Sequence, residues 1–369
     1  MGWNPLRRYS TRGTKRMKGR FSSALFIAVL AAALVPAVVW GLLSGSVPVS
    51  AKSALEGFFF TIGRGGDETS AALVFGIRLP RILLALLVGA SLGTAGACFQ
   101  GIFRNSLADP YIIGASSGAA LGAALGAALA VSAAGLPGLG FFSALGPPGI
   151  FAFAGSFAAV ILAFAVSRAV SRTFGNAPSP ASLILAGTSI SAFCSALLAL
   201  VLVIKDRNLV QVYYWLLGSL AGTTWPRLVS ALPFIVLGNI VIFASVRPLD
   251  LLLQGDESAE SLGLDPLKTR FILALAATLP VSSAVSVSGV IGFVGLIAPH
   301  AVRFFTGPGH RRLLPASALA GALLTLAADN LARSIIPPVE LPLGVITSLG
   351  GAPFFLFLLA RRRNRGSFV

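Results

Sequence analysis

Ionisable residues are rare inside the apolar stretches of this chain, and Asp329 is the main candidate for chemistry there. A carboxylate in such a position could hold a coupling ion in an ion-driven carrier. Arg333 follows four residues later, which puts both side chains on one face of a helix. We therefore expect a structural Asp329–Arg333 pair near a helix end, and we keep a coupling-ion site at Asp329 as the alternative.

Other reactive residue types lack the partners that chemistry needs. Cys98 and Cys194 sit in apolar runs and are expected to be small buried hydrophobes without a disulfide. His300 and His310 have no ligand-type residue at metal spacing, so no metal or cofactor is expected. None of the five lysines follows a glycine, which excludes a phosphate-binding P-loop. With no hydrolase-like cluster either, the chain is not expected to be an enzyme, and it has no candidate catalytic residue.

The loop at residues 247–266 carries more charge than any other internal loop. Its pattern predicts two short helices, separated by Gly255 and ended at Gly263. Three acidic residues suit the dipole at the start of the second helix: Asp256, Glu257 and Glu260. Two leucines, Leu262 and Leu264, stand where a loop should be wet. This combination favours a docking helix for a cytoplasmic partner over a solvated linker whose leucines lie on the membrane.

Composition defines the elements that must position these residues. Of the 369 residues, 56% are hydrophobic and 11% are charged, and the mean hydropathy is +0.87. Soluble domains carry about a quarter charged residues, so the chain is predicted to be an all-α polytopic membrane protein. The net charge of +16 lies in tails and short loops rather than on a soluble face. The bilayer is therefore the expected partner, and nucleic acid is not.

About ten transmembrane helices follow from a span length of roughly 20 residues. Their expected ranges are 21–43, 80–103, 111–132, 150–168, 181–204, 228–246, 270–287, 291–305, 313–333 and 342–360. The first apolar run is too long for a signal peptide and is interpreted as an uncleaved span. Residues 211–222 are too few to cross and predict an interfacial or re-entrant helix. The expected domains are a basic cytoplasmic tail at 1–20, a ten-helix transmembrane domain at 21–360 and a basic cytoplasmic tail at 361–369.

The distribution of positive charge orients these spans. With both termini cytoplasmic, 20 of the 28 lysines and arginines fall inside and 8 fall outside. Arg78, Arg81 and Arg333 are then external, against the trend. Anchors that snorkel at a helix start, held by Pro80, are the simplest explanation for Arg78 and Arg81.

Small residues indicate tight packing between helices. Four glycines repeat every four residues along the third span and two along the second: Gly114, Gly118, Gly122, Gly126, Gly89 and Gly93. Asp109 and Pro110 fit the N-cap and first position of the third span. The second and seventh spans are weakly similar, and their offset of five spans predicts an inverted repeat of the kind that transporters use.

Four stretches together carry a family resemblance that covers about residues 30–363. They are RLPRILLALLVGASLGTAGACFQGIFRNSLADPYIIGASSGAALGA, GDESAESLGLDP, GFVGLIAPHAVRFFTGPGHRRLLPASALAGALLTLAADNLAR and ELPLGVITSLGGAPFFLFLL. The chain resembles the FecCD/BtuC-type permeases, the iron-siderophore, haem and cobalamin branch of bacterial ABC importers. The resemblance implies a type II importer permease that pairs with a second permease (homodimer or paralogue), two cytoplasmic ATPases and an extracytoplasmic binding protein.

Residue roles follow from the same resemblance. ATPase coupling is implied for Gly255, Asp256, Glu257, Ala259, Glu260, Leu262, Gly263 and Leu264. Docking of the binding protein is implied for Arg78, Arg81 and Arg333, and a cytoplasmic gate for Ser179, Pro180 and Ala181, with the fifth and tenth spans lining the pathway. The basic N-terminal tail and residues 51–70 fit the family poorly and receive no role.

The resulting hypothesis is an ATP-driven importer permease of the bacterial cytoplasmic membrane, with an iron(III)-siderophore complex as substrate. Import of cobalamin or haem by the same architecture is the alternative, and an ion-coupled carrier using Asp329 is a more distant one. Replacing Arg78 and Arg81 by Glu is expected to weaken docking while leaving insertion and ATPase assembly intact.

Overall fold

A computed structural model describes residues 23–45, 49–61, 66–129, 140–173, 179–204 and 209–363. Within these ranges the chain is built from helices, without a β-strand ladder. The long helices are α1 (Ser23–Leu43), α4 (Leu79–Ile102), α6 (Gly146–Thr173), α7 (Pro180–Ile204), α9 (Trp225–Ala244), α12 (Pro266–Ser288), α14 (His310–Ser334) and α15 (Leu343–Arg363). Shorter helices are α2 (Ala51–Thr61), α3 (Glu68–Ala71), α5 (Ala115–Leu129), α8 (Leu209–Leu216), α10 (Val246–Leu252), α11 (Asp256–Ser261) and α13 (Val294–Thr306).

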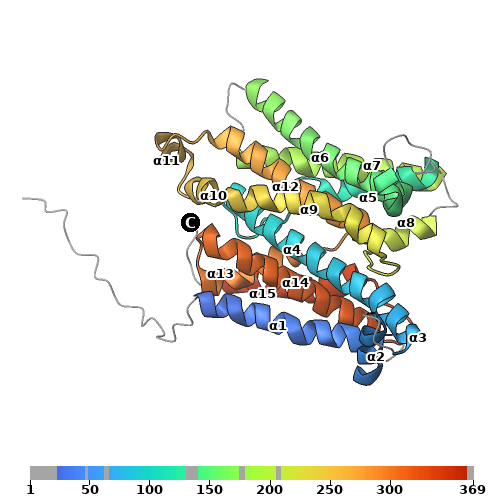
Figure 1. The fold of residues 1–369 in the computed structure, drawn as a ribbon. Helices are drawn as coiled ribbons and strands as arrows, with labels where there is room; N and C mark the ends of the chain where they lie inside the picture. Colours follow the sequence, from blue (N-terminus) through green and yellow to red (C-terminus); the bar gives the residue numbers. More distant parts are fainter. Residues whose placement is uncertain are drawn as a thin grey trace, which may run out of the picture.

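The long helices run roughly side by side, so the bundle has two ends (Figure 1). Helices α10 and α11 lie at one, which we call the α11 end, and α2 and α3 lie at the other, the α3 end. Seven helices of the described chain are long and apolar enough to cross a membrane, and α5 and α15 are shorter apolar helices. These nine helices and α13 match the ten predicted spans in order, which gives a polytopic α-helical membrane protein.

Two predicted spans, the third and the eighth, begin three or four residues before their helices. The third was expected from 111, with Asp109 and Pro110 as its cap, but α5 begins at Ala115. The Asp109 carboxylate accepts the Tyr111 backbone N–H at 2.8 Å and so stabilises a turn before the helix. The eighth helix, α13, has 13 residues, about 20 Å of helix. It is tolerated because most of it is buried in protein, where its free backbone groups meet partners other than lipid.

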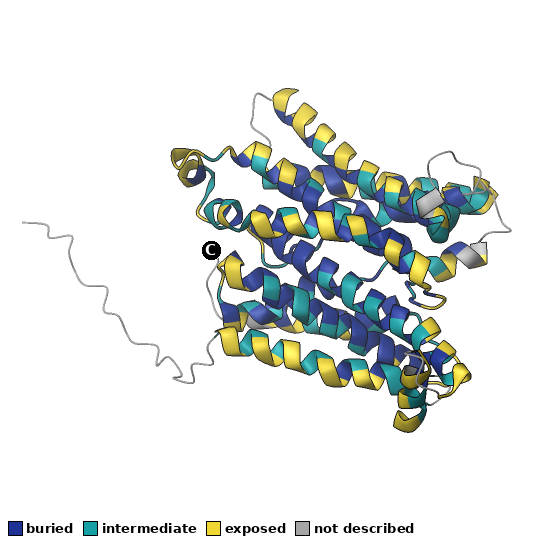
Figure 2. Cartoon of the chain, in the orientation of Figure 1, coloured by how far each residue is buried: buried dark blue, intermediate teal, exposed yellow. Residues whose placement is uncertain are grey.

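The core is centred on α4 and α12, and most residues of both helices are buried (Figure 2). Helix α4 packs along α14, and α12 packs along α6. In span numbers, the second packs on the ninth and the seventh packs on the fourth. An offset of five spans relates the second to the seventh and the ninth to the fourth, so the two contacts are equivalent. The packing therefore has the pattern of the predicted inverted repeat.

Glycines on α5 and α4 let neighbouring backbones approach. A β-carbon added at Gly122 would lie 2.0 Å from the Phe151 carbonyl oxygen, and Gly118 and Gly126 face the same helix, α6. Gly89 and Gly93 likewise lie against α14, where an added β-carbon would sit 2.3 and 2.2 Å from backbone oxygens. Such distances are far below contact, so any larger residue would force the helices apart.

Gly114 does not belong to this ridge, contrary to the prediction. It lies one residue before α5 with φ +95°, a conformation that glycine adopts without strain. The error comes from the late start of α5, because spacing along the sequence places residues on one face only where the helix already exists.

The two terminal tails fall largely outside the described residues. Residues 1–20 lie wholly outside them, and of 361–369 only the backbone of 361–363 is described, as the last turn of α15. Part of the 51–70 region is described: α2 and α3 pack on each other at the α3 end.

Candidate coupling, gate and docking sites

The acidic loop folds into the two short helices that its pattern predicts. Helix α10 ends at Leu252 and α11 begins at Asp256, with Gly255 between them at φ +109°. Gly263, at φ +81°, follows the end of α11. Both glycines occupy conformations that disfavour other residues, so they fix the path of the loop. Asp256 and Glu257 lie in the first turn of α11, where their charge is favourable.

Asp256 ties α11 to the bundle. Its two carboxylate oxygens accept hydrogen bonds of 2.6 and 2.8 Å from the Arg270 guanidinium on α12. Arg104, from the connection after α4, lies 3.3 Å from the same carboxylate. The hydrogen bond from Arg270, with the charges of Arg270 and Arg104, holds the pKa of Asp256 below its ordinary value, although partial burial opposes this. The carboxylate therefore stays ionised and bound at neutral pH.

A second tie joins α10 to α14. The backbone N–H of His310 donates to the Asp250 carboxylate at 2.9 Å, and His310 Nδ1 lies 2.7 Å from the same oxygen. His310 is fully buried, and so are Leu249 and Leu252 on α10. Sequence reasoning missed both Asp250 and His310, because the two residues lie sixty positions apart and meet only in the folded bundle. Motion of α10 is thus tied to a long core helix.

The remaining coupling candidates divide into exposed and buried residues. Leu262 is 62% exposed, and Glu257 and Glu260 are also exposed. Ala259 is fully buried, and Leu264 packs against the core. Leu262 therefore leaves most of its apolar side chain open at the α11 end, where a protein partner could cover it.

The gate candidates form the start of α7. Ser179 is its N-cap: the Ser179 Oγ accepts the Ser182 N–H at 3.1 Å, and the Ser182 Oγ accepts the Ser179 N–H at 3.0 Å. Pro180 occupies the first helical position, which it favours. The Ser182 hydroxyl also lies 2.9 Å from that of Ser167 on α6. The capping box thus stabilises the start of α7, and Ser182 joins that start to α6. Ser182 is the residue that the sequence prediction missed, although the Ser-Pro-x-Ser spacing signals it.

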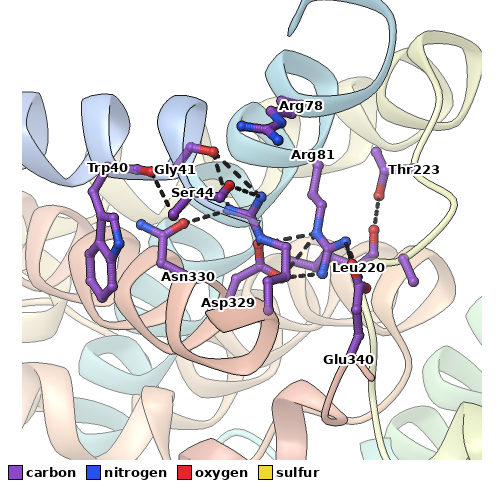
Figure 3. Close-up of polar contacts among 12 residues, drawn as sticks. Trp40, Gly41, Ser44, Arg78, Arg81, Leu220, Thr223, Asp329, Asn330 and Glu340 are labelled. Atoms are coloured by element: carbon purple, nitrogen blue, oxygen red, sulfur yellow. Dashed lines mark hydrogen bonds and ion pairs between the residues drawn. The ribbon is translucent and has the colours of Figure 1, made fainter. Parts of the chain in front are cut away.

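The three candidate docking arginines lie in one polar cluster: Figure 3 shows Arg78 and Arg81 near Asp329 and Glu340, and Arg333 joins them through its contacts with Asp329 and Asn330. Arg81 donates to Asp329 at 2.9 and 3.1 Å and to Glu340 at 2.9 and 3.1 Å. Arg333 Nε lies 3.2 Å from Asp329 Oδ2, which Arg81 also contacts, and this confirms the predicted Asp329–Arg333 pair. Asp329 is completely buried. A fixed carboxylate between two guanidinium groups suits an ion-pair network better than an ion site that must fill and empty.

Arg78 and Arg333 also cap a helix end. Both guanidinium groups donate to backbone carbonyls in the last turn of α1 or just beyond it: Leu42 for Arg78, Gly41 and Ser44 for Arg333. These carbonyls have no partner within their own helix, and the negative end of the helix dipole attracts cations. The cluster therefore locks α1 to α4 and α14.

The three arginines for which docking is implied do not form an exposed basic patch. Their residues are only 3 to 9% exposed, because two carboxylates and several carbonyls enclose them. Replacing Arg81 by Glu would set a third carboxylate beside Asp329 and Glu340. That change would strain the bundle itself, so it cannot serve as a clean test of docking, contrary to the expectation above.

These features together define a class of protein. An all-helical membrane bundle whose core helices pair in the pattern of an inverted repeat, with an anchored pair of short helices at one end, has the architecture of a membrane transport protein. Comparison with known proteins then identifies the family.

The chain belongs to the FecCD transport family, whose model matches residues 28–361. It is 44% identical to the cobalamin import system permease protein BtuC of Halobacterium salinarum, over 82% of this chain and 77% of that protein. It is 38% identical to the Fe(3+) dicitrate transport system permease protein FecD of Escherichia coli, over 90% and 96%. A solved inward-facing conformation of an ABC transporter assigned to the metal-chelate type superposes with TM-score 0.78 at 31% identity, covering 91% and 99%.

Membership of this family defines the general role of the chain. The chain is a noncatalytic permease subunit of an ABC importer, and ATP hydrolysis belongs to a separate subunit. The family implies three kinds of protein partner: an ATPase, a substrate-binding protein and a second permease.

Proposed function

We propose that this chain is the membrane permease of an ATP-driven importer for iron(III)-siderophore complexes. The observation that carries the importer assignment is the anchored coupling loop. Helices α10 and α11 are tied by Asp250 and Asp256 to α14 and α12, while Leu262 stays open to a partner. A force applied to α11 would therefore reach the core helices directly. FecD and related iron(III) permeases support the substrate class, and the cobalamin permease supports the alternative of cobalamin or haem.

The proposed assembly is a homodimer with two ATPases at the α11 end and a binding protein at the α3 end. The α11 end is cytoplasmic, with both termini, in the orientation that places most arginines inside. The membrane is the bacterial cytoplasmic membrane. Helices α7 and α15 line the pathway between the two copies, and both carry widely exposed apolar residues that a second permease would cover, such as Leu185 and Leu349.

Ser179, Pro180 and Ala181, at the start of the capping box that Ser182 closes, are the proposed cytoplasmic gate. They lie at the start of α7, where the Ser182 hydroxyl is hydrogen-bonded to that of Ser167 on α6. A change in the α6–α7 angle would therefore open or narrow this end of the pathway without breaking either helix.

Docking of the binding protein at the arginine cluster is a proposal that the geometry modifies. Arg81 is shared with Glu340, whose side chain is 30% exposed. An acidic partner would dock by replacing Glu340 as the partially exposed partner of Arg81, rather than by meeting a free basic patch. The three arginines and two carboxylates leave one positive charge to guide such a partner.

The decisive experiment is uptake by the purified permease–ATPase complex in proteoliposomes, with ferric siderophore, haem and cobalamin each presented on its binding protein. We expect ATP-dependent accumulation, with the ferric siderophore transported fastest. Uptake that continues without ATP would overturn the importer proposal. Faster uptake of cobalamin or haem would overturn only the substrate.

A further inference from the structure

A cavity of about 600 Å³ opens at the α11 end between α6, the start of α7 and the start of α12. Its volume is in the range of small-molecule sites. None of the functions described above uses it. Ser179 and Pro180 of the proposed gate line the cavity. So do Asp265, from the loop at residues 247–266, and Arg270, which binds Asp256 of that loop.

The walls of the cavity are apolar. They include Ile161 and Phe164 from α6 and Leu267 and Phe271 from α12, and most of the exposed lining area is carbon. The rings of Phe164 and Phe271 meet edge to face at 5.4 Å, which joins the two helices across the cavity. Such walls suit hydrocarbon chains rather than a water-filled passage.

The rim of the cavity is basic. Arg168 and Arg172 come from the end of α6 and Lys268 from the start of α12, and all three are exposed. Among the described residues that line the cavity, the one acid is Asp265, which is exposed and whose carboxylate accepts the Lys268 N–H as the N-cap of α12. Arg270 is engaged by Asp256. The neighbouring residues 174–178 contain no acid to neutralise the rim.

We propose that this cavity binds an anionic phospholipid of the cytoplasmic leaflet, with its phosphate at Arg168, Arg172 and Lys268 and its acyl chains against α6 and α12. The charge complementarity and the apolar walls identify the occupant, because clustered bases beside membrane helices select anionic headgroups. The leaflet rests on the orientation given under the proposed function. Bound there, the lipid would connect the proposed gate at the start of α7 with the start of α12, which follows α11.

This bridging gives the lipid a regulatory role. The α6–α7 hairpin and the start of α12 must shift relative to each other when α11 is pushed. A lipid held by bases on both sides would resist or synchronise that shift. Transport per ATP is therefore expected to depend on anionic lipid at this position.

The test counts phospholipid that remains bound to the detergent-purified permease–ATPase complex, by native mass spectrometry. The probes are phosphatidylglycerol and phosphatidylcholine added at equal concentration. The wild-type complex should retain phosphatidylglycerol selectively. The triple variant Arg168→Gln/Arg172→Gln/Lys268→Gln should lose that retention, with apparent affinity falling by about a hundredfold. The matched control Arg311→Gln/Arg312→Gln removes two exposed arginines at the same end, outside the cavity, and should retain lipid.

Equal retention of both lipids by the wild type, or undiminished retention by the triple variant, would overturn the proposal. Displacement of the lipid by millimolar inorganic phosphate would assign the site to a soluble anion instead. Loss of the ATPase from the triple variant during purification would show that the surface is an ATPase contact. ATP-dependent uptake in phosphatidylglycerol and phosphatidylcholine vesicles separates this inference from the proposed function, because an importer without the lipid site would transport equally in both.

Discussion

At the α3 end Asp329 is fully buried between Arg81 and Arg333, whereas at the α11 end Asp256 keeps 37% of its side chain exposed while it holds Arg270 and Arg104. Both carboxylates pair with two guanidinium groups, yet their surroundings differ. The first network is enclosed by α1, α4 and α14, and removing a partner would leave buried charge. The Asp256 network lies at the first turn of α11, where a partner can reach it.

The buried Asp329 network is suited to stabilising the fold, and the half-exposed Asp256 network is suited to transmitting motion. A sealed ion network holds helices in place and has little freedom to change. A half-exposed one can hold a loop in register and still transmit force. We therefore expect changes at the α3 end to affect the folded state most, and changes at the α11 end to affect transport more than stability.

The largest effect is expected from Asp329→Asn. Arg81 and Arg333 would lose their common carboxylate inside the bundle, at a cost of about 3–5 kcal/mol of stability. Thermal unfolding of the purified complex measures this loss, and Glu68→Gln, an exposed change at the same end, should leave it unaltered. Normal unfolding with abolished uptake would instead favour the ion-coupled carrier.

Asp256→Asn should affect transport more than stability. Arg270, 4% exposed, would lose a charged hydrogen-bond partner worth about 1.5–3 kcal/mol, and α11 would lose its fixed position. We expect uptake to fall by roughly tenfold, with a smaller change in melting temperature than for Asp329→Asn. The control Glu56→Gln removes the exposed pair with Lys52 and should change neither. A larger loss of stability than of uptake would break the comparison.

Leu262→Ala tests the exposed leucine at the end of α11. Because the side chain is 62% exposed, folding should be unaffected, while a partner that buries it would lose roughly 1.5–3 kcal/mol. Titration of the ATPase onto the detergent-purified permease measures this change. Ile336→Ala, at a 52% exposed residue of the α3 end, is the matched control. Equal ATPase affinity for the wild type and the Leu262 variant would exclude this contact.

Glu340→Gln tests how the α3 end meets the binding protein. Arg81 would then keep only Asp329, so an acidic partner should bind a few-fold more tightly at low salt and show a steeper salt dependence. Surface plasmon resonance with the binding protein measures both, and Glu68→Gln serves as the control. Weaker or unchanged binding would remove Arg81 from the docking site.

The smallest effect is expected from pH. The pKa of Asp256 is lowered in the folded chain, so its anchoring is fully present above the ordinary aspartate pKa of about 3.9. It is lost as pH falls through the lower folded value. Hydrogen exchange of the α11 amides should thus show pH-independent protection between pH 6 and 8, after correction for intrinsic rates. Protection that already declines near pH 6 would contradict the assigned ion pair.

Local signals predicted much of this molecule because they act within one element. Gly255 and Gly263 bracket α11 as expected, and the i, i+4 spacing of Asp329 and Arg333 produced their ion pair. The same logic failed at Gly114, where the helix starts later than the apolar run. It also gave no sign of Glu340 or His310, whose partners come from other elements.

The sequence by itself determined the class of the chain, the order of its spans, the two short helices around Gly255 and the family, because hydropathy, turn residues and family motifs are properties of continuous segments. Only the tertiary structure decided that the three arginines are enclosed rather than exposed. Only it joined Arg168 to Lys268 around one cavity. The physical reason is the same in both cases: burial and charge neutralisation depend on which distant segments pack together, and a guanidinium group carries the same charge in the sequence whether or not a carboxylate lies beside it.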